Sequence, residues 1–228
     1  LGFASTLGRV DGTNAVVRGE LQDNCRMIAG ATDLPVSADL ENCYADAPEA
    51  AAETIRLAAE AGVVGGSIED ATGNSRKPIY DFALAVERVQ AAVAAARALP
   101  FPFTLTARAE NFLHERPDLD NTIRRLQAFA RAGADVLYAP GLKDLATIRT
   151  VVASVPKPVN VLMSTLDPAL TVRHLGEAGV KRISVGSALA RLGLAAVMPG
   201  ARALKDRGSF AWASEAISSR ELKDNFQV

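Results

Sequence analysis

The chain has 228 residues, of which 49% are hydrophobic and 22% charged, so it can bury one sizeable globular core. Its formal net charge is −1 and its basic residues are scattered, which gives no support to nucleic-acid binding. No apolar run approaches the roughly 20 residues that span a bilayer, and no signal peptide is recognisable. The two cysteines, Cys25 and Cys43, form neither a disulfide framework nor a zinc motif, so a cytoplasmic protein is expected.

Short apolar runs typical of β-strands alternate along the chain with longer runs typical of helices. Strands are expected at residues 35–40, 63–68, 103–107, 136–139, 159–163 and 182–185. Helices are expected between them at residues 50–61, 79–99, 119–132, 142–154 and 168–178, and after them at residues 187–207. Ala-Gly pairs that end at Gly62, Gly133 and Gly179 close three of these helices, since glycine commonly follows a helix end.

Strict alternation of strand and helix is the signature of a parallel sheet, and over this many units it favours a (β/α)8 TIM-type barrel. An open doubly wound sheet is the alternative, but no G-x-G-x-x-G motif follows a strand. A complete barrel needs two more strands, so the first strand-helix-strand segment is expected to precede Leu1. The barrel is expected to cover residues 1–208, with a helical tail at residues 209–228 that packs on a neighbouring subunit.

Charged side chains stand where three neighbouring strands are expected to end. Asp39 and Glu41 lie two residues apart after the first strand, Glu69 ends the second, and Arg108 ends the third. Side chains two apart share one face of a strand, and the C-terminal ends of barrel strands carry the catalytic groups. These four side chains are therefore expected to converge. Asp70 has the opposite parity and is expected to pair with a neighbouring strand or helix terminus instead.

Three carboxylates close together repel one another unless a cation lies among them. Because the expected ligands are all oxygen atoms, the sequence predicts Mg²⁺, with Mn²⁺ as an alternative, at Asp39, Glu41 and Glu69. The planar fork of Arg108 matches a carboxylate or phosphonate, so this residue is predicted to bind the substrate. A metal and an arginine at a barrel mouth suit a 2-oxo acid, whose enolate the metal would stabilise.

Other chemistry receives less support from the sequence. His114 and His174 are the only histidines, and both are expected to be surface or loop residues because neither shares a strand end with the carboxylates. Cys43 is expected to be a packing residue, and no strand ends on the lysine that a Schiff-base aldolase needs. A phosphate cup at Gly186-Ser187, where a long helix begins, is a further alternative.

Two stretches carry a resemblance to a known family. They read VSADLENCYADAPEAAAETIRLAAEAGVVGGSIED at residues 36–70 and TARAENF at residues 106–112. The paired acid motif, the Ile-Glu-Asp that follows it, and the Ala-Arg with an acidic residue form an ordered set that resembles the phosphoenolpyruvate mutase/isocitrate lyase superfamily. The resemblance runs through essentially the whole chain. It implies a Mg²⁺-dependent (β/α)8 barrel that acts on 2-oxo acids or related polyacids through enolate-like intermediates, and a homodimer or homotetramer that exchanges its last helix.

The family pattern also implies roles for single residues. Asp39 would bind Mg²⁺ directly, and the other two carboxylates would hold it through water. Asp11 would be an acidic catalytic residue beside the substrate, and Arg108 would act on and bind the substrate. A small loop at Gly2-Phe3 would bind substrate oxygens through its backbone amides.

This chain departs from the lyases of the superfamily, which carry a Lys-Cys-Gly-His loop after Ile-Glu-Asp. Here residues 71–77 read Ala-Thr-Gly-Asn-Ser-Arg-Lys, so the chain resembles the phosphonomutase-like branch that lacks that loop. Pro140 stands where family members often place Glu or His. Tyr44, Tyr138 and Asn160 are candidates for the missing polar function, with Asn160 as a substrate-binding residue.

The expected protein is thus a Mg²⁺-dependent lyase, mutase or hydrolase of a C–C or P–C bond. C–C cleavage, or hydrolysis or decarboxylation of the oxaloacetate type, is favoured over P–C mutase chemistry. One alternative is a non-catalytic, metal-dependent barrel that binds a dicarboxylate, because the loop cysteine is absent and Pro140 offers no acid. The other is a phosphate-binding barrel enzyme centred on Gly186-Ser187.

Overall fold

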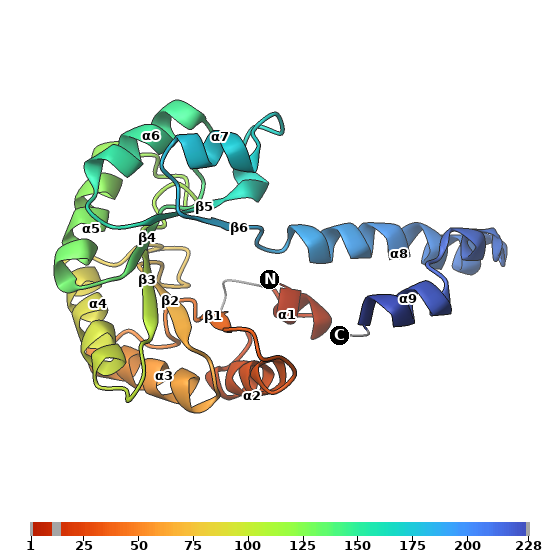
Figure 1. The fold of residues 1–228 in the computed structure, drawn as a ribbon, viewed down its shortest axis with the longest axis horizontal. Helices are drawn as coiled ribbons and strands as arrows, with labels where there is room; N and C mark the ends of the chain where they lie inside the picture. Colours follow the sequence, from red (N-terminus) through yellow and green to blue (C-terminus); the bar gives the residue numbers. More distant parts are fainter. Residues whose placement is uncertain (1, 11–14, 227–228) are drawn as a thin grey trace. The chain divides into compact units, whose positions relative to one another are not determined.

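The central feature is one parallel sheet, seen in a computed structural model that describes residues 2–10 and 15–226 (Figure 1). Its strands are β1 (Ser37–Asp39), β2 (Gly65–Glu69), β3 (Thr104–Arg108), β4 (Val136–Tyr138), β5 (Val159–Leu162) and β6 (Arg182–Ser184). Each strand pairs in parallel with the next in chain order, as successive βα units produce. The α/β class and the six-stranded sheet are as predicted. Within the described ranges β1 and β6 are the sheet edges, so a closed eight-stranded barrel is not shown.

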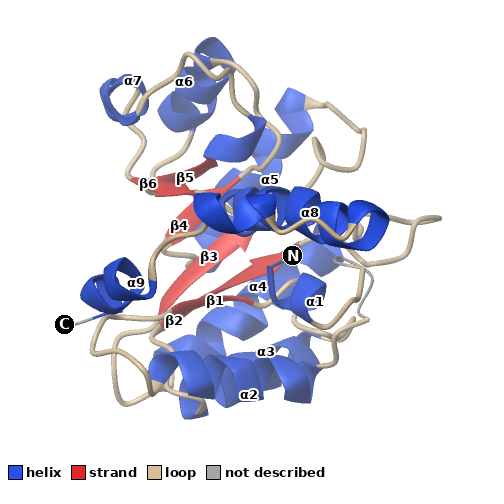
Figure 2. Ribbon diagram, turned by 90° about the vertical axis from the view of Figure 1, so that its right-hand side faces the viewer, coloured by secondary structure: helices blue, strands red, loops and turns tan. Residues whose placement is uncertain are grey.

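Helices cover the outer, convex side of the curved sheet (Figure 1), and Figure 2 shows the strands side by side from β1 to β6. These helices are α2 (Arg18–Ala29), α3 (Pro48–Glu60), α4 (Phe82–Arg97), α5 (Leu119–Ala132), α6 (Leu145–Ser154) and α7 (Val172–Glu177). The sequence did not predict α2, because its twelve residues are mostly polar and only Cys25 is buried. The remaining helices follow the predicted ones, with boundaries that shift by a few residues.

Two positions show how the sequence determines these elements locally. The helix α5 begins after Asp118, whose side chain accepts a hydrogen bond from the Asn121 amide at 2.8 Å, and it ends at Gly133, which has a φ of 104°. Gly66 lies in β2 where a Cβ atom would come within 2.8 Å of the Leu40 side chain. The glycine therefore lets the segment after β1 pack directly on β2.

The internal contacts divide the described chain into two compact units, one from Phe3 to Gly186 and one from Ser187 onward. The second unit contains α8 (Ala188–Arg207), the 3-10 helix η2 (Ala211–Glu215) and α9 (Ser219–Phe226). Within it, Gly200 of α8 lies against the Trp212 ring of η2. The expected boundary at residue 208 stays a prediction. No helix in the described part of the chain is long and apolar enough to cross a membrane.

Candidate active site

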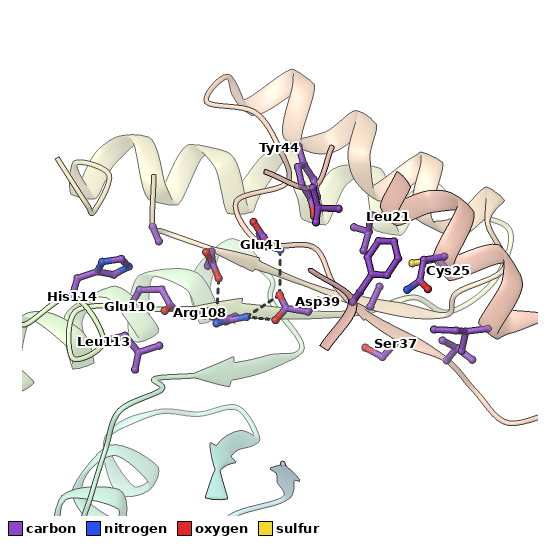
Figure 3. A pocket seen from close by; sticks show the side chains of 18 residues that line it. Leu21, Cys25, Ser37, Asp39, Glu41, Tyr44, Arg108, Glu110, Leu113 and His114 are labelled. Carbon is purple, nitrogen blue, oxygen red and sulfur yellow. Dashed lines mark hydrogen bonds and ion pairs between the residues drawn. The ribbon is translucent and has the colours of Figure 1, made fainter. Parts of the chain in front are cut away.

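A cavity of about 420 Å³ lies beside β1 and at the C-terminal ends of β1, β2 and β3 (Figure 3). One end, the charged end, is lined by four carboxylates, one guanidinium and one imidazole: Asp39, Glu41, Glu69, Glu110, Arg108 and His114. The rest of the lining is mostly apolar and includes Phe3, Val16, Leu21, Ile28 and Val36; Figure 3 shows Leu21 away from Glu110 and His114. The predicted convergence of the strand ends is thus found. Parallel pairing of Glu69 with Arg108 places two of the strand-end side chains next to each other.

Arg108 is the centre of the charged end. Its Nη1 donates to both carboxylate oxygens of Asp39 at 2.9 Å. Its Nη2 lies 3.2 Å from a Glu69 oxygen and its Nε donates to Glu110 at 2.8 Å. The guanidinium also stacks 5.0 Å from the centre of the Tyr138 ring, and only 11% of the side chain is exposed. Such a buried fork is rigid, because every nitrogen has a defined partner.

The carboxyl groups respond differently to this environment. Loss of water would raise the pKa of Asp39, but Arg108 and the backbone N–H of Glu41 outweigh it and hold that pKa below its usual value. Glu69 is more enclosed, and burial together with the neighbouring carboxylates raises its pKa well above the usual value despite Arg108. Negative charge is therefore only partly balanced at this end of the cavity.

The predicted metal ligands can be judged by their chemistry. Asp39, Glu41, Glu69 and Glu110 place four carboxylates on this cavity against the single guanidinium of Arg108, as far as the described lining residues show. In the described ranges no three His, Cys, Asp or Glu side chains are already gathered as a ligand set. An excess of carboxylate oxygens nevertheless fits a hard ion that keeps several waters and takes only one or two direct ligands, which is the habit of Mg²⁺.

Asp70 has the structural role that its parity predicted. Its carboxylate pairs with Arg125 of α5 at 3.0 Å and accepts the backbone N–H of Glu110 at 2.8 Å. Arg125 in turn donates to the Tyr80 carbonyl at 3.0 Å. Burial raises the pKa of Asp70 to about 6 against the opposing effect of Arg125. This network holds the chain after β3 in place and with it the Glu110 side chain.

The segment after β1, residues 41–46, has a strained backbone and is held by a side chain of α4. Glu41, Cys43 and Tyr44 have φ values of 49°, 57° and 55°, in the left-handed region that side chains disfavour. Arg88 of α4, 1% exposed, donates to three carbonyls of this segment: Ala45, Asp46 at 2.8 Å and Asn42 at 2.5 Å. The strained conformation that presents Glu41 to the cavity thus depends on a buried arginine.

The other predicted site residues have mixed outcomes. Phe3 lines the cavity, but Gly2–Thr6 forms the helix α1 and not the expected loop, because Thr6 and Leu7 both hydrogen-bond to the Phe3 carbonyl. The structure does not bring Asn160 to this cavity: its amide bonds Ser184 at 3.0 Å and Arg182 at 3.1 Å. Asp11 lies outside the described residues.

The sequence analysis gave no role in the site to Glu110 or His114, which both line the cavity. Glu110 is 3% exposed and shares the strand parity of Arg108, so the alternation Thr106, Arg108, Glu110 carried the signal. His114 was expected in a loop, and it does lie in the loop after β3, but that loop turns it to the cavity. No local pattern predicts that turn.

Comparison with known proteins agrees with this geometry. The profile of the phosphoenolpyruvate phosphomutase family matches residues 1–205. A solved structure from Burkholderia cenocepacia J2315, described as a lyase/mutase, is 51% identical with a TM-score of 0.93 and covers 100% of this chain and 81% of that one. Oxaloacetate acetylhydrolase in complex with the product oxalate is 26% identical with a TM-score of 0.84 (96% and 77% covered). Oxaloacetate decarboxylase of Rhodopseudomonas palustris is 28% identical over 90% of this chain and 70% of its own.

Two findings lead to one assignment. The family profile matches nearly the whole chain, and the strand ends of the parallel sheet carry Asp39, Glu69 and Arg108. The resemblance seen in the sequence is confirmed, with lyase, mutase and hydrolase members among the similar proteins. The chain belongs to the phosphoenolpyruvate phosphomutase family of the phosphoenolpyruvate mutase/isocitrate lyase superfamily.

Proposed function

We propose that the protein is a Mg²⁺-dependent enzyme that cleaves a bond next to the 2-oxo group of a small carboxylate, with oxaloacetate-type compounds as the favoured class. The observation that carries the proposal is the Arg108 fork, buried among three carboxylates at the charged end of the cavity. Relatives that act on oxaloacetate support the substrate class. Two free buried cysteines are compatible with work in the cytoplasm.

In this proposal the chain's own residues bind and orient the substrate. Asp39, with Glu41 and Glu69, holds Mg²⁺, which when bound supplies positive charge that stabilises an enolate. When Asp39 holds the ion, Nη1 of Arg108 is left free to donate to a substrate carboxylate. Glu110 keeps the guanidinium in orientation through Nε, and Asp70 holds Glu110 through its backbone N–H. Asp11 remains a proposed acidic catalytic residue, and the Gly2-Phe3 amides remain proposed substrate contacts.

The test is turnover of oxaloacetate, phosphonopyruvate, 2-methylisocitrate and 2,3-dimethylmalate with and without Mg²⁺. Glu69→Gln should abolish metal-dependent product formation, because it removes a carboxylate from the charged end while keeping its shape. Glu53→Gln is the matched control, since Glu53 lies on the surface of α3 and pairs only with Arg56 in the contacts described. Metal-independent turnover that survives Glu69→Gln would refute the proposal.

The two alternatives predict other results. A non-catalytic barrel would bind oxalate with Mg²⁺ but form no product from any compound of the panel. A phosphate-binding enzyme centred on Gly186-Ser187 would keep its activity in Asp39→Ala. Complete loss of activity in that variant would therefore rule out the phosphate-centred alternative.

A homodimer or homotetramer is also proposed. The second unit exposes several large apolar side chains, whose contact with water is unfavourable. They include Leu189, Leu192, Val197, Phe210 and Ile217, each more than half exposed. A second copy of the chain is the proposed occupant of this surface, in line with the helix exchange that the family resemblance implies. Light scattering after size exclusion should give a multiple of the chain mass, and Leu192→Asp with Val197→Asp should reduce it to the monomer.

A further inference from the structure

The proposed reaction needs a proton donor, and neither the loop after β2 nor Pro140 supplies one in this chain. The loop after β2 has no Cys or His, and three of its polar side chains are engaged by nearby residues. Thr72 Oγ1 bonds the Lys77 carbonyl, Asn74 Oδ1 accepts the Arg76 amide at 2.9 Å, and Lys77 pairs with Asp81 at 2.5 Å. A donor therefore has to be sought on the cavity wall itself.

His114 is placed on that wall by a closed turn. Leu113 and His114 donate their backbone N–H groups to the Glu110 carbonyl at 3.0 and 3.2 Å. Glu115 follows in the left-handed conformation with a φ of 56°, which reverses the chain directly after the histidine. Asp70 holds the start of the turn through the Glu110 amide. The imidazole is thus carried by a well-anchored segment, and Figure 3 shows it beside Glu110 on the side of the cavity that holds Arg108.

The imidazole of His114 is half-buried, and it has no hydrogen-bond partner among the side chains and backbone groups that the structure describes. The other histidine is engaged structurally, because Nδ1 of His174 accepts the Thr171 amide at 3.3 Å where α7 begins. Asp39, Glu69 and Glu110 are all paired with Arg108. An imidazole both gives and takes a proton in the neutral range, which makes it suited to the task.

We propose that His114 is a catalytic residue that contacts the bound substrate and protonates the enolate carbon. The inference rests on the proposed function and deepens it. For oxaloacetate, the C3–C4 bond breaks, its electron pair remains on C3 as the pyruvate enolate, and carbon dioxide leaves. The imidazolium N–H then gives its proton to C3, which yields pyruvate and a neutral imidazole, and water returns a proton to the ring.

The first experiment measures ligand contact without turnover. Oxalate is titrated with Mg²⁺ by calorimetry, and the two histidine C2–H resonances are followed by NMR, with His114→Asn to assign them. Binding of oxalate should shift the His114 resonance and leave that of His174 in place. Binding without a shift at His114 overturns this inference alone. Absence of oxalate binding overturns the proposed function, and this inference falls with it.

The second experiment measures catalysis on oxaloacetate. His114→Asn should lower kcat by at least about 100-fold, the usual contribution of a general acid, with KM within about threefold of wild type. Added imidazole should restore part of kcat, which no purely structural defect would allow. His174→Asn is the matched control and should keep kcat. An unchanged kcat in His114→Asn would overturn the inference. A kcat that is lost in Tyr44→Phe but kept in His114→Asn would also overturn it, since Tyr44 is the rival donor in the same cavity.

Discussion

Replacement of Arg88 by methionine should destabilise the protein strongly, because it removes the buried cation under the segment that carries Glu41. Three carbonyl groups lose a charged donor, and each such bond contributes about 1.5 kcal/mol or more. The stack of the guanidinium on Tyr80, at 4.2 Å from the ring centre, is lost as well. The variant no longer has to bury a charge, which offsets part of these losses. The expected net decrease in the free energy of unfolding is therefore about 3 kcal/mol. For a chain of this size that corresponds to a fall in Tm of about 6–12 °C.

The assay is urea unfolding followed by circular dichroism, with the midpoint and the slope m fitted together. Arg88→Lys should recover only part of the loss, because one ammonium group cannot reproduce a fork that reaches three carbonyls. Arg56→Met is the control, since Arg56 makes an exposed pair with Glu53 on α3 and should cost less than about 0.5 kcal/mol. Amide hydrogen exchange at residues 41–46 should accelerate in Arg88→Met beyond the change elsewhere.

A loss below about 1 kcal/mol at unchanged m, with unchanged exchange at residues 41–46, would refute the reasoning. It would mean that the left-handed residues Glu41, Cys43 and Tyr44 hold their conformation without the arginine. A uniform rise of exchange over the whole sheet would also count against a local clamp.

Three further outcomes are expected. Asp70→Asn leaves Arg125 buried without its counter-charge and should lower the free energy of unfolding in urea by about 3–5 kcal/mol. The double variant with Arg125→Met should recover part of this loss. Strictly additive losses would show that the two side chains are not coupled. Burial raises the pKa of the Cys43 thiol to about 12, so in Cys25→Ser protein its reaction with Ellman's reagent should stay slow from pH 7 to 9 and become fast only on unfolding; rapid native labelling would contradict this. Gly66→Val should cost about 1–3 kcal/mol by overpacking against Leu40, and a neutral thermal shift would show that the strand can move apart.

The elements of the fold could be read from the sequence because their signals are local. The start of α5 after Asp118 and its end before Gly133 depend on a cap and a left-handed glycine, both visible in the chain. The six strands were likewise visible as short apolar runs between the helical ones. The helix α2 was missed because most of its side chains are polar and only Cys25 is buried, which leaves little periodicity to detect.

Strand parity was sufficient for the part of the site that lies on the strands themselves. Because side chains alternate, Asp39, Glu69 and Arg108 had to meet once the strands paired in parallel, and Asp70 had to point elsewhere. Strand parity could not predict that Arg108 pairs with three carboxylates, since that depends on how far its side chain reaches across two neighbouring strands.

The sequence by itself determined the class of fold, the charged set at the strand ends and the family to which these belong. The tertiary structure alone decided which loop residues join that set. His114 faces the cavity because the Asp70–Arg125 network and the turn at Glu115 orient its loop, and Asn160 is drawn away by Ser184 and Arg182. The physical reason is that strand positions follow from a local period, whereas the direction of a loop side chain depends on contacts between residues far apart in the chain.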